Sequence, residues 1–139
     1  MDKITFTIIK PNAVEAGNTE KIFAMIEADG FRLKARRELT LTKEQAGEFY
    51  AVHAGKPFYE PLVEFMTSGP AVVALLERED AVRELRRLAG ATDPAEAAEG
   101  TIRRIYGENV RRNAIHASDS EENALKEAGQ FFTRQEIFG

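Results

Sequence analysis

Apolar and polar residues follow strand-like patterns in four segments of the chain. Residues 4–9 alternate isoleucine or phenylalanine with threonine, which predicts a half-buried strand. Residues 31–41 carry apolar side chains at one parity and mostly basic ones at the other, as in a long strand with one wet face. Residues 71–76 are continuously apolar, which is typical of a central strand covered on both faces. A short fourth strand is expected over residues 113–117.

Helical spacing of apolar residues fills the intervals between these strands. Helices are expected over residues 19–29, 42–50, 62–66, 80–89 and 101–106, with a last one from 118 through 128. Thr42 and Gln45 fit a capping box, and Ser118 through Glu121 fit a second. Asp80 is expected to cap its helix, which ends before Gly90.

The resulting order of elements, βαββαβ followed by a further helix, predicts the fold class. It matches an α/β fold of the α+β sandwich type: a ferredoxin-like core with a four-stranded antiparallel sheet, helices on one face, and extra helical pieces. The chain shows no internal repeat, low-complexity tract or linker, so residues 1–139 are expected to form a single domain.

Composition excludes several kinds of site. The 139 residues include no cysteine and only two histidines, which rules out disulfides and cysteine nucleophiles and argues against a protein metal site. No apolar stretch reaches the roughly 20 residues of a membrane span, and the start, Met1–Ile4, lacks the features of an export signal. A cytoplasmic protein without a membrane partner is therefore expected.

Charge is unevenly distributed. The formal net charge is −4, which argues against a stable nucleic-acid partner. The segment from Arg83 to Arg112 nevertheless holds seven arginines against five acidic residues. A local anion site explains this segment, and so does a set of solvated helix faces.

His116 is the strongest candidate for chemistry. It ends the predicted fourth strand, and its parity is opposite to that of Ile115, so the two side chains point to opposite faces. At neutral pH an unperturbed imidazole is mostly an uncharged base or nucleophile. Polar neighbours, with an acid further on at Glu127, can orient the ring. The competing interpretation is a histidine hydrogen-bonded for structural reasons. The other histidine, His53, is explained by a helix C-terminus and is given no catalytic role.

Arginine and aromatic side chains supply candidate contacts to a nucleotide. Arg86 and Arg103 lie at spacings that could converge on phosphate, which the planar guanidinium grips well. Arg111 and Arg112 carry no such signal and are expected to face solvent. Phe58, between two prolines, offers a surface on which a planar ring can stack, although packing onto the sheet explains it equally well. The chain contains neither a Walker loop nor a Gly-x-Gly-x-x-Gly motif.

Several motifs together resemble one family. The run Asn113 to Ser120 (NAIHASDS) is similar to the active-site signature of the nucleoside diphosphate kinases. The similarity continues in order along the chain, in the runs TIIKPN (7–12), FY (49–50), KPFY (56–59), FMTSGP (65–70), GATDPA (90–95) and EGTIR (99–103). It covers essentially the whole chain.

The resemblance implies an enzyme that transfers the γ-phosphoryl group of a nucleoside triphosphate to a nucleoside diphosphate by a ping-pong mechanism. His116 would become phosphohistidine. The matching positions that contact phosphates, sugar or base are Lys10, Phe58, Arg86, Thr92, Arg103 and Asn113. Lys10 also belongs to the implied catalytic set, with Tyr50, Ser118 and Glu127 as supporting residues. Mg²⁺ would be held mainly by the nucleotide phosphates, and a homo-oligomer, tetramer or hexamer, is implied.

Four positions depart from the family pattern. Ala117 stands where glycine is commoner, which matters only if the backbone there needs a positive φ. Asn12 stands where aspartate is usual, Lys56 where arginine is common, and Asp93 where asparagine is common. Two other functions stay open on the sequence: a ferredoxin-like module that binds nucleotides or RNA without turnover, and a hydrolase using His116 as a general acid–base.

Overall fold

A four-stranded sheet forms the centre of the computed structural model, which describes residues 3–139. Its strands are β1 (Ile4–Ile9), β2 (Arg32–Leu39), β3 (Ala71–Glu77) and β4 (Ile115–Ala117). They lie in the order β2-β3-β1-β4, and each neighbouring pair is antiparallel. This order is that of the predicted ferredoxin-like core, so the predicted fold class is confirmed.

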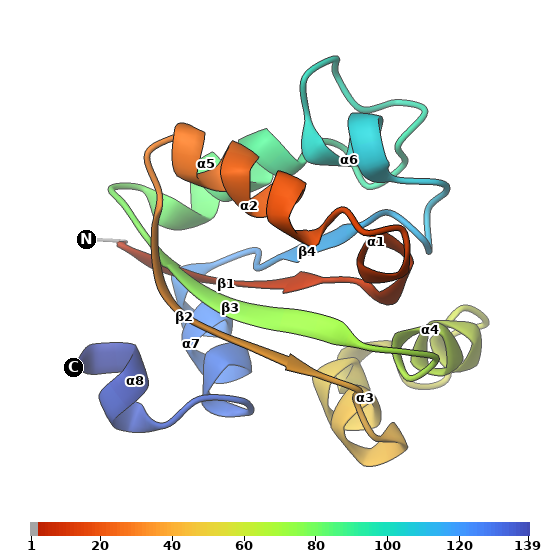
Figure 1. Ribbon diagram of the computed structural model, residues 1–139. Coiled ribbons are helices and arrows are strands. Elements are labelled where there is room, and N and C mark those ends of the chain that lie inside the picture. Colours follow the sequence, from red (N-terminus) through yellow and green to blue (C-terminus); the bar gives the residue numbers. More distant parts are fainter. Residues whose placement is uncertain (1–2) are drawn as a thin grey trace.

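Eight α-helices and one 3₁₀ helix surround the sheet within the described residues (Figure 1). They are α1 (Pro11–Glu15), α2 (Thr19–Ala28), α3 (Lys43–Phe49), η1 (Ala51–His53), α4 (Tyr59–Met66), α5 (Ala81–Ala89), α6 (Ile102–Tyr106), α7 (Glu121–Gly129) and α8 (Arg134–Phe138). The sequence reading missed α1 and α8. Pro11 sits in the first turn of α1, where its missing N–H costs nothing, and a Thr133–Glu136 capping box opens α8.

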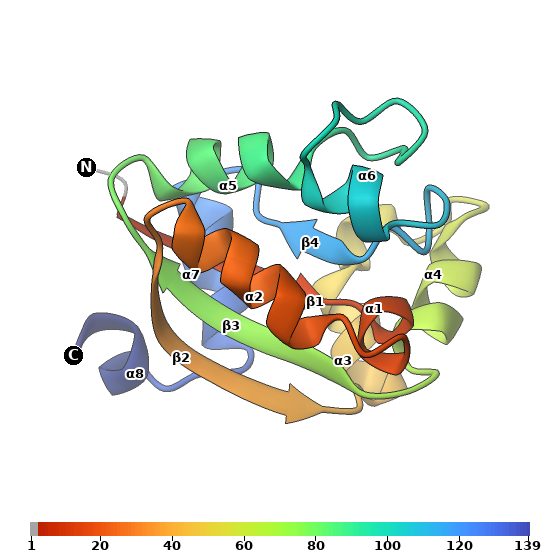
Figure 2. The same cartoon turned by 45° about the horizontal axis from the view of Figure 1, so that its top comes forward.

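Helices cover both faces of the sheet, whereas the sequence predicted them on one face (Figure 2). On one face α2 and α5 pack over Val72, Ala74 and Leu76 of β3. On the other face α3, α4, α7 and α8 pack over Val73 and Leu75. Because successive side chains of a strand point to opposite faces, β3 divides its apolar residues between two cores. The extra helices thus form the second core.

The burial of β1 and the length of β2 differ from the sequence prediction. β1 was expected to be half-buried, but Thr5 and Thr7 are completely buried, since helices cover both faces. The Thr7 hydroxyl donates to the backbone oxygen of His116 over 2.6 Å. β2 is shorter than the predicted strand and has an irregular register between Leu33 and Ala35. This irregularity breaks the simple parity on which the longer strand was predicted.

The structure confirms some of the predicted helix caps and contradicts others. Thr42 and Gln45 form the expected capping box. Asp80 precedes α5 as predicted, but it has φ +53° and makes no capping hydrogen bond; its carboxylate accepts from Arg83 instead. The predicted capping box at Ser118 is wrong, because Ser120 caps α7 through the backbone N–H of Asn123. Ser118 is thereby left for another role.

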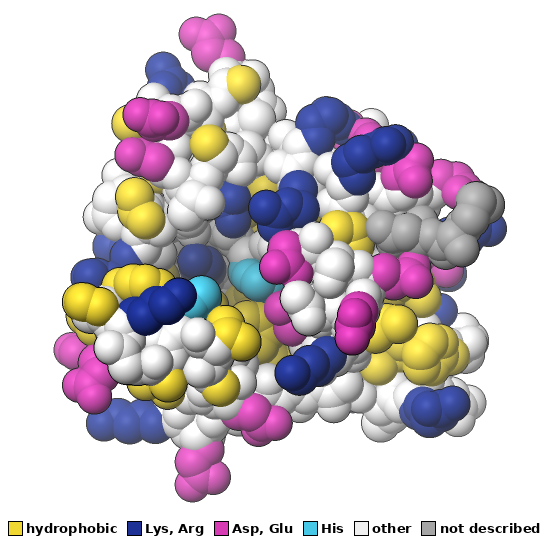
Figure 3. Space-filling view, turned by 180° about the vertical axis from the view of Figure 1, so that it is seen from behind, with side chains coloured by type: hydrophobic (Ala, Val, Ile, Leu, Met, Phe, Trp, Pro, Cys, Tyr) yellow, Lys and Arg dark blue, Asp and Glu magenta, His cyan; other side chains and the backbone are white. Residues whose placement is uncertain are grey.

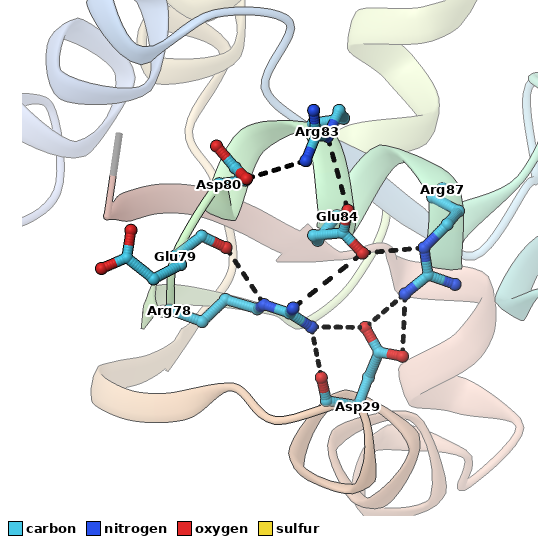
Figure 4. Close-up of polar contacts among 7 residues, drawn as sticks. All are labelled: Asp29, Arg78, Glu79, Asp80, Arg83, Glu84 and Arg87. Carbon is cyan, nitrogen blue, oxygen red and sulfur yellow. Dashed lines mark hydrogen bonds and ion pairs between the residues drawn. The ribbon is translucent and has the colours of Figure 1, made fainter. Parts of the chain in front are cut away.

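An ion-pair network fixes α5 against the end of α2 (Figure 4). The Asp29 carboxylate, just beyond α2, accepts from Arg87 over 2.7 Å and from Arg78 over 3.1 Å. Glu84 accepts from Arg87 over 2.9 Å and lies 3.4 Å from Arg83. Two arginines of the basic segment, Arg83 and Arg87, are therefore engaged with acids of the scaffold, which leaves Arg86 on the same helix for other contacts.

Met1 and Asp2, part of the start that was read for an export signal, lie outside the described residues. Over residues 3–139, no helix has the length and apolar character needed to cross a membrane.

Candidate active site

A cavity of about 1270 Å³ opens beside β4. Its wall comes from the end of β1, from the segment between α3 and α4, from α5, α7, and the residues before β4. In Figure 3 the histidine side chains lie in and beside a hollow, with lysine and arginine side chains around it. All nucleotide-binding positions implied by the family resemblance line this cavity: Lys10, Phe58, Arg86, Thr92, Arg103 and Asn113.

His116, in the middle of β4, is held by an acid from α7. Its Nε2 lies 2.9 Å from Oε1 of Glu127. The same carboxylate oxygen accepts a 2.6 Å hydrogen bond from the Ser118 hydroxyl. Ser118 is completely buried and also lies 3.1 Å from the backbone oxygen of Phe6. The structure thus brings together three of the predicted site residues, and a carboxylate at Nε2 favours the tautomer with the proton on that nitrogen.

The imidazole is surrounded by aromatic rings on the face of the sheet away from Ile115. The His116 ring centroid is 5.0 Å from that of Phe49 and 6.3 Å from that of Phe6. Burial lowers the pKa of His116, although the Glu127 carboxylate acts in the opposite direction. The ring is therefore uncharged near neutral pH and has a free lone pair at Nδ1, which makes no hydrogen bond within residues 3–139.

The backbone beside His116 is unusual. Ala114 has φ +77°, a left-handed conformation rare for a residue with a Cβ, and its carbonyl accepts from the Lys10 N–H over 2.8 Å. Ala117, where glycine is commoner in the family, lies in regular strand. The methyl group at position 117 therefore needs no special backbone conformation, and this departure is accommodated.

Two buried cations lie close to the imidazole. Lys10 is only 7% exposed, and burial together with the nearby Arg103 lowers its pKa to about 7. Arg103 donates to the backbone oxygens of Gly90 and Ile115 over 2.8 and 2.9 Å, which fixes its guanidinium. Its Nε is buried without a partner. Burial and the neighbouring Arg86 lower the pKa of Arg103 to about 10. Such a concentration of positive charge is costly unless an anion binds there.

The remaining polar positions extend this wall. Arg86 reaches the backbone oxygen of Ala117 over 3.5 Å. Asn113 donates to the backbone oxygen of Thr92 over 3.0 Å, while its own side-chain oxygen is buried without a partner. Arg86, Thr92 and Arg103 also line a second, smaller cavity of about 370 Å³. The two arginines thus line both cavities.

Tyr50 and Phe58 occupy the wall formed after α3. The hydroxyl of Tyr50 is buried without a partner, and burial raises its pKa. Phe58 is 45% exposed, so it does not simply pack onto the sheet. The ammonium group of Lys56 lies 5.8 Å from the centroid of the Phe58 ring.

Four further residues on the cavity wall were not found by sequence reasoning: His53, Val110, Arg111 and Asp119. His53 was explained as a helix-end residue, yet its ring centroid lies 5.1 Å from that of Phe58 and its Nδ1 is buried without a partner. Val110 is 57% exposed on a loop that has no periodicity to reveal it. Arg111 is exposed, as expected, and it also lines the cavity.

An uncharged imidazole beside buried cations is the arrangement that phosphoryl transfer to a side chain requires, and on this antiparallel α+β scaffold it indicates a phosphotransferase. Comparison with known proteins is more specific. The family model "Nucleoside diphosphate kinase" matches residues 3–137. The chain therefore belongs to the nucleoside diphosphate kinase family.

Individual relatives agree along their whole length. The nucleoside diphosphate kinase of Azorhizobium caulinodans is 53% identical over 97% of this chain and 96% of its own length. That of Phenylobacterium zucineum is 50% identical over the full length of both chains. Among solved structures, the nucleoside diphosphate kinase of Aquifex aeolicus has a TM-score of 0.94 at 46% identity, covering 97% of this chain and 98% of that one. A halophilic nucleoside diphosphate kinase from Halobacterium salinarum in complex with CDP has a TM-score of 0.93 at 39% identity, with coverages of 99% and 91%.

Proposed function

We propose that this nucleoside diphosphate kinase works through phosphorylated His116. The observation that carries the proposal is the pairing of His116 Nε2 with Glu127 over 2.9 Å, which leaves Nδ1 unpaired in a cationic cavity. Nδ1 attacks the γ-phosphorus of a nucleoside triphosphate as the bond from that phosphorus to the bridging oxygen breaks. The nucleoside diphosphate leaves with the bond's electrons, and a second nucleoside diphosphate then takes the phosphoryl group from the histidine by the reverse chemistry.

The surrounding charges support this transfer. Lys10, Arg86 and Arg103 provide positive charge for the phosphate oxygens, and preorganised donors of this kind are often the largest catalytic contribution. As the N–P bond forms, the imidazole becomes positive, and the Glu127 carboxylate stabilises that charge. The Ser118 hydroxyl donates to the same Glu127 oxygen that contacts His116, and it thereby fixes the carboxylate.

The other cavity residues are assigned to the nucleoside. Val52, Phe58 and Val110 are exposed apolar side chains on the cavity wall. Phe58 and Val110 are assigned to the base, and stacking of this kind discriminates little between bases. The unpaired buried oxygen of Asn113 can accept a hydrogen bond from a bound hydroxyl group or a water, and the hydroxyl of Tyr50 can donate to a phosphate oxygen or a water. Thr92 adds a further donor beside Arg86.

Mg²⁺ fits this site as a companion of the nucleotide. No cluster of three potential metal-ligating side chains exists within residues 3–139. Mg²⁺ commonly binds substrate phosphates plus one or two carboxylates and keeps several waters. Asp119 is a cavity carboxylate free for that water shell, and its hydrogen bond from Asn123 keeps its pKa below the usual value. When bound, the ion neutralises charge on the transferred phosphoryl group.

Labelling with γ-³²P-ATP tests the proposed nucleophile. The protein should acquire a label that is stable to base, labile to acid, and removed by a nucleoside diphosphate. His116→Ala should abolish the label while retaining most nucleotide binding, whereas His53→Ala should still be labelled. Persistent label in His116→Ala would show that another side chain is the nucleophile. The hydrolase and the non-catalytic binding module, both disfavoured by the family match, would give no stable label.

Residues 1–139 are proposed to form a single domain, supported by the two cores that share one sheet. The assembly is proposed to be a homo-oligomer, tetramer or hexamer. Exposed apolar side chains away from the cavity, at Ile105 and Phe138, are available for subunit contacts. Sedimentation velocity checks this: a sedimentation coefficient of a 15.5 kDa monomer would contradict it. A cytoplasmic location is proposed on composition, since cysteine is absent.

A further inference from the structure

The loop between α6 and β4 is closed by its own hydrogen bonds. The carbonyl of Arg112 accepts from the backbone N–H groups of Glu108 and Asn109 over 2.7 and 3.4 Å. The side-chain oxygen of Asn109 accepts from the backbone N–H groups of Arg111 and Arg112 over 3.0 and 2.9 Å. This compact loop carries Val110 to the cavity and leads directly into Asn113, so its position fixes one side of the cavity mouth.

Asn12 ties this loop to the end of β1. It lies in α1, two residues after Lys10, and is only 3% exposed. Its side-chain nitrogen donates to the Arg112 carbonyl over 3.1 Å and to the Glu108 carboxylate over 3.3 Å. Both contacts require a donor. An aspartate at this position would present only acceptors and would face a second carboxylate at Glu108.

Arg112 extends the connection to the opposite wall. Its Nε lies 3.2 Å from Oε1 of Glu108, and its guanidinium carbon lies 5.2 Å from the centroid of the Phe65 ring. Phe65 belongs to α4, the helix that begins immediately after Phe58. Arg112 was expected to face solvent, and its side chain is indeed 40% exposed, but it joins the two segments that carry Val110 and Phe58.

We propose that Asn12, Glu108 and Arg112 form a positioning unit that fixes the spacing of Phe58 and Val110 at the mouth of the cavity and thereby sets the affinity for the nucleotide base. None of the three side chains lines the cavity. The spacing matters because dispersion contacts decline steeply with distance, and a gap below 1 Å already forfeits much of the attraction. The proposal rests on the proposed function, since it assumes that the nucleotide occupies this cavity.

Asn12→Asp is the direct test. The carboxylate at position 12 should repel Glu108 and displace the loop, so that KM for ADP rises about 10-fold. A change of this size lies within the loss of affinity expected when a base is no longer stacked. The turnover number at saturation should stay within about twofold, because His116 and its cations are untouched. Adding Glu108→Gln in the same chain should restore part of the affinity, since an amide at position 108 can donate to the carboxylate at position 12.

Tripolyphosphate distinguishes positioning of the base from general damage to the site. It carries phosphates but no base, so its inhibition constant should be the same in the wild-type protein and in Asn12→Asp. Equal weakening of ADP and tripolyphosphate, or an unchanged KM for ADP, would overturn the proposal. The wild-type protein must itself be labelled by γ-³²P-ATP; absence of that label contradicts the proposed function and not the positioning unit.

Arg112→Ala decides the matter should Asn12→Asp not fold, because its partly exposed side chain is tolerant of truncation. It should raise KM for ADP severalfold without changing the inhibition by tripolyphosphate. Arg83→Ala is the matched control, since Arg83 pairs with Asp80 and Glu84 away from the cavity. An Arg112→Ala protein with the same KM as Arg83→Ala would refute the role of Arg112.

Discussion

Glu127 holds two hydrogen bonds on one carboxylate oxygen, one to the reactive imidazole and one to Ser118. The arrangement fixes both the orientation of His116 and the site of its proton. It also explains how a histidine whose pKa is lowered by burial can still accept a phosphoryl group, because the positive charge that develops on the ring meets a fixed negative charge. In the proposed reaction, Glu127 is therefore the acid that prepares the nucleophile.

Replacing Glu127 with glutamine should slow phosphorylation of His116. A hydrogen bond to a charged group contributes about 1.5–3 kcal/mol, which corresponds to roughly 10- to 150-fold in rate. Nucleotide affinity should change little, since Glu127 is engaged with His116 and Ser118. Rapid-quench measurement of label formation checks this. Glu122→Gln, on the exposed side of the same helix, is the control, and equal rates for the two variants would contradict the assigned role.

Lys10 should make nucleotide binding dependent on pH. In the free protein its pKa is lowered to about 7, so the ammonium group is lost as pH rises from 6 to 8.5. Bound phosphates favour the charged form, so binding of ADP at pH 7 should take up about half a proton. ADP affinity should weaken above pH 7. Calorimetry in buffers of different ionisation enthalpy measures the uptake, and Lys10→Met should remove it.

The same group gives the free protein a stability profile of known sign. Between about pH 7 and its ordinary pKa near 10.5, unfolded Lys10 holds a proton that the folded protein does not. Contributions from Lys10 therefore raise the free energy of unfolding as pH increases through this window. Urea titrations at several pH values, on the wild-type protein and on Lys10→Met, give the free energy of unfolding of each. If this free energy did not rise more with pH in the wild-type protein than in Lys10→Met, the lowered pKa would be contradicted.

At the scale of elements, the turn that follows α5 requires glycine at position 90. Gly90 has φ +88° and ψ −176°, a region essentially limited to glycine, and a Cβ there would lie 2.6 Å from the Thr101 hydroxyl. Its carbonyl also accepts from Arg103. The end of α5 and the placement of Arg103 therefore depend on one residue without a side chain.

Gly90→Ala should lower the free energy of unfolding by about 1–3 kcal/mol because of backbone strain and the contact with Thr101. It should also reduce activity, since Arg103 loses a fixed hydrogen-bond acceptor. Urea denaturation and steady-state kinetics measure the two effects. Gly69→Ala is the control, because Gly69 has no positive φ and an added Cβ meets nothing within 4 Å. Similar behaviour of the two variants would contradict the prediction.

Elements with a strong local pattern could be predicted from sequence, and those defined by long-range contacts could not. β3 was correctly predicted as fully covered, because its continuous apolar run has one structural explanation. β1 was predicted to be half-buried because its apolar residues alternate with threonine, which is polar. Thr5 and Thr7 are in fact completely buried, on the face of β1 that they share with Ile9 and that α2 and α5 cover, and the Thr7 hydroxyl donates to the backbone oxygen of His116 on the neighbouring strand.

The candidate site shows the same division. The sequence offered Glu127 as an acid able to orient His116, the family resemblance implied the same role, and the structure pairs the two side chains. His53 and Val110 reach the cavity only through the folding of segments with no regular spacing, so their place was not foreseeable. Ser118 was assigned to a capping box by its local motif and to the supporting residues by the family resemblance. In the structure Ser120 takes the cap, and Ser118 is hydrogen-bonded to Glu127, nine positions away.

At the scale of the whole molecule, several positively charged side chains gather at one cavity. The protein carries a net charge of −4, yet Lys10, Arg86 and Arg103 gather at one cavity, while Arg83 and Arg87 are paired with acids of the scaffold. The concentrated positive charge opposes folding in the free protein and favours binding of an anion. Nucleotide and fold should therefore be thermodynamically linked.

ADP should raise the melting temperature substantially. At a concentration 100-fold above its dissociation constant, a ligand adds about 2.7 kcal/mol to the free energy of unfolding. For a chain of this size that is on the order of 10 °C. Differential scanning fluorimetry checks the shift. Single-stranded RNA at the same nucleotide concentration should leave the melting temperature unchanged, and an equal shift would favour the nucleic-acid-binding alternative.

The pairing of β1 with β4 has a consequence for folding during synthesis on the ribosome. Of the four strands, β1 is synthesised first and β4 last. About three quarters of the chain is therefore made between Lys10 and His116, which lie close together after β1 pairs with β4. Glu127 follows later still. A nascent or truncated chain that stops before α7 can form much of the sheet and carry the cationic wall, but it lacks the acid that prepares the histidine. In the proposed reaction, label on His116 therefore requires that synthesis has passed Glu127 in α7.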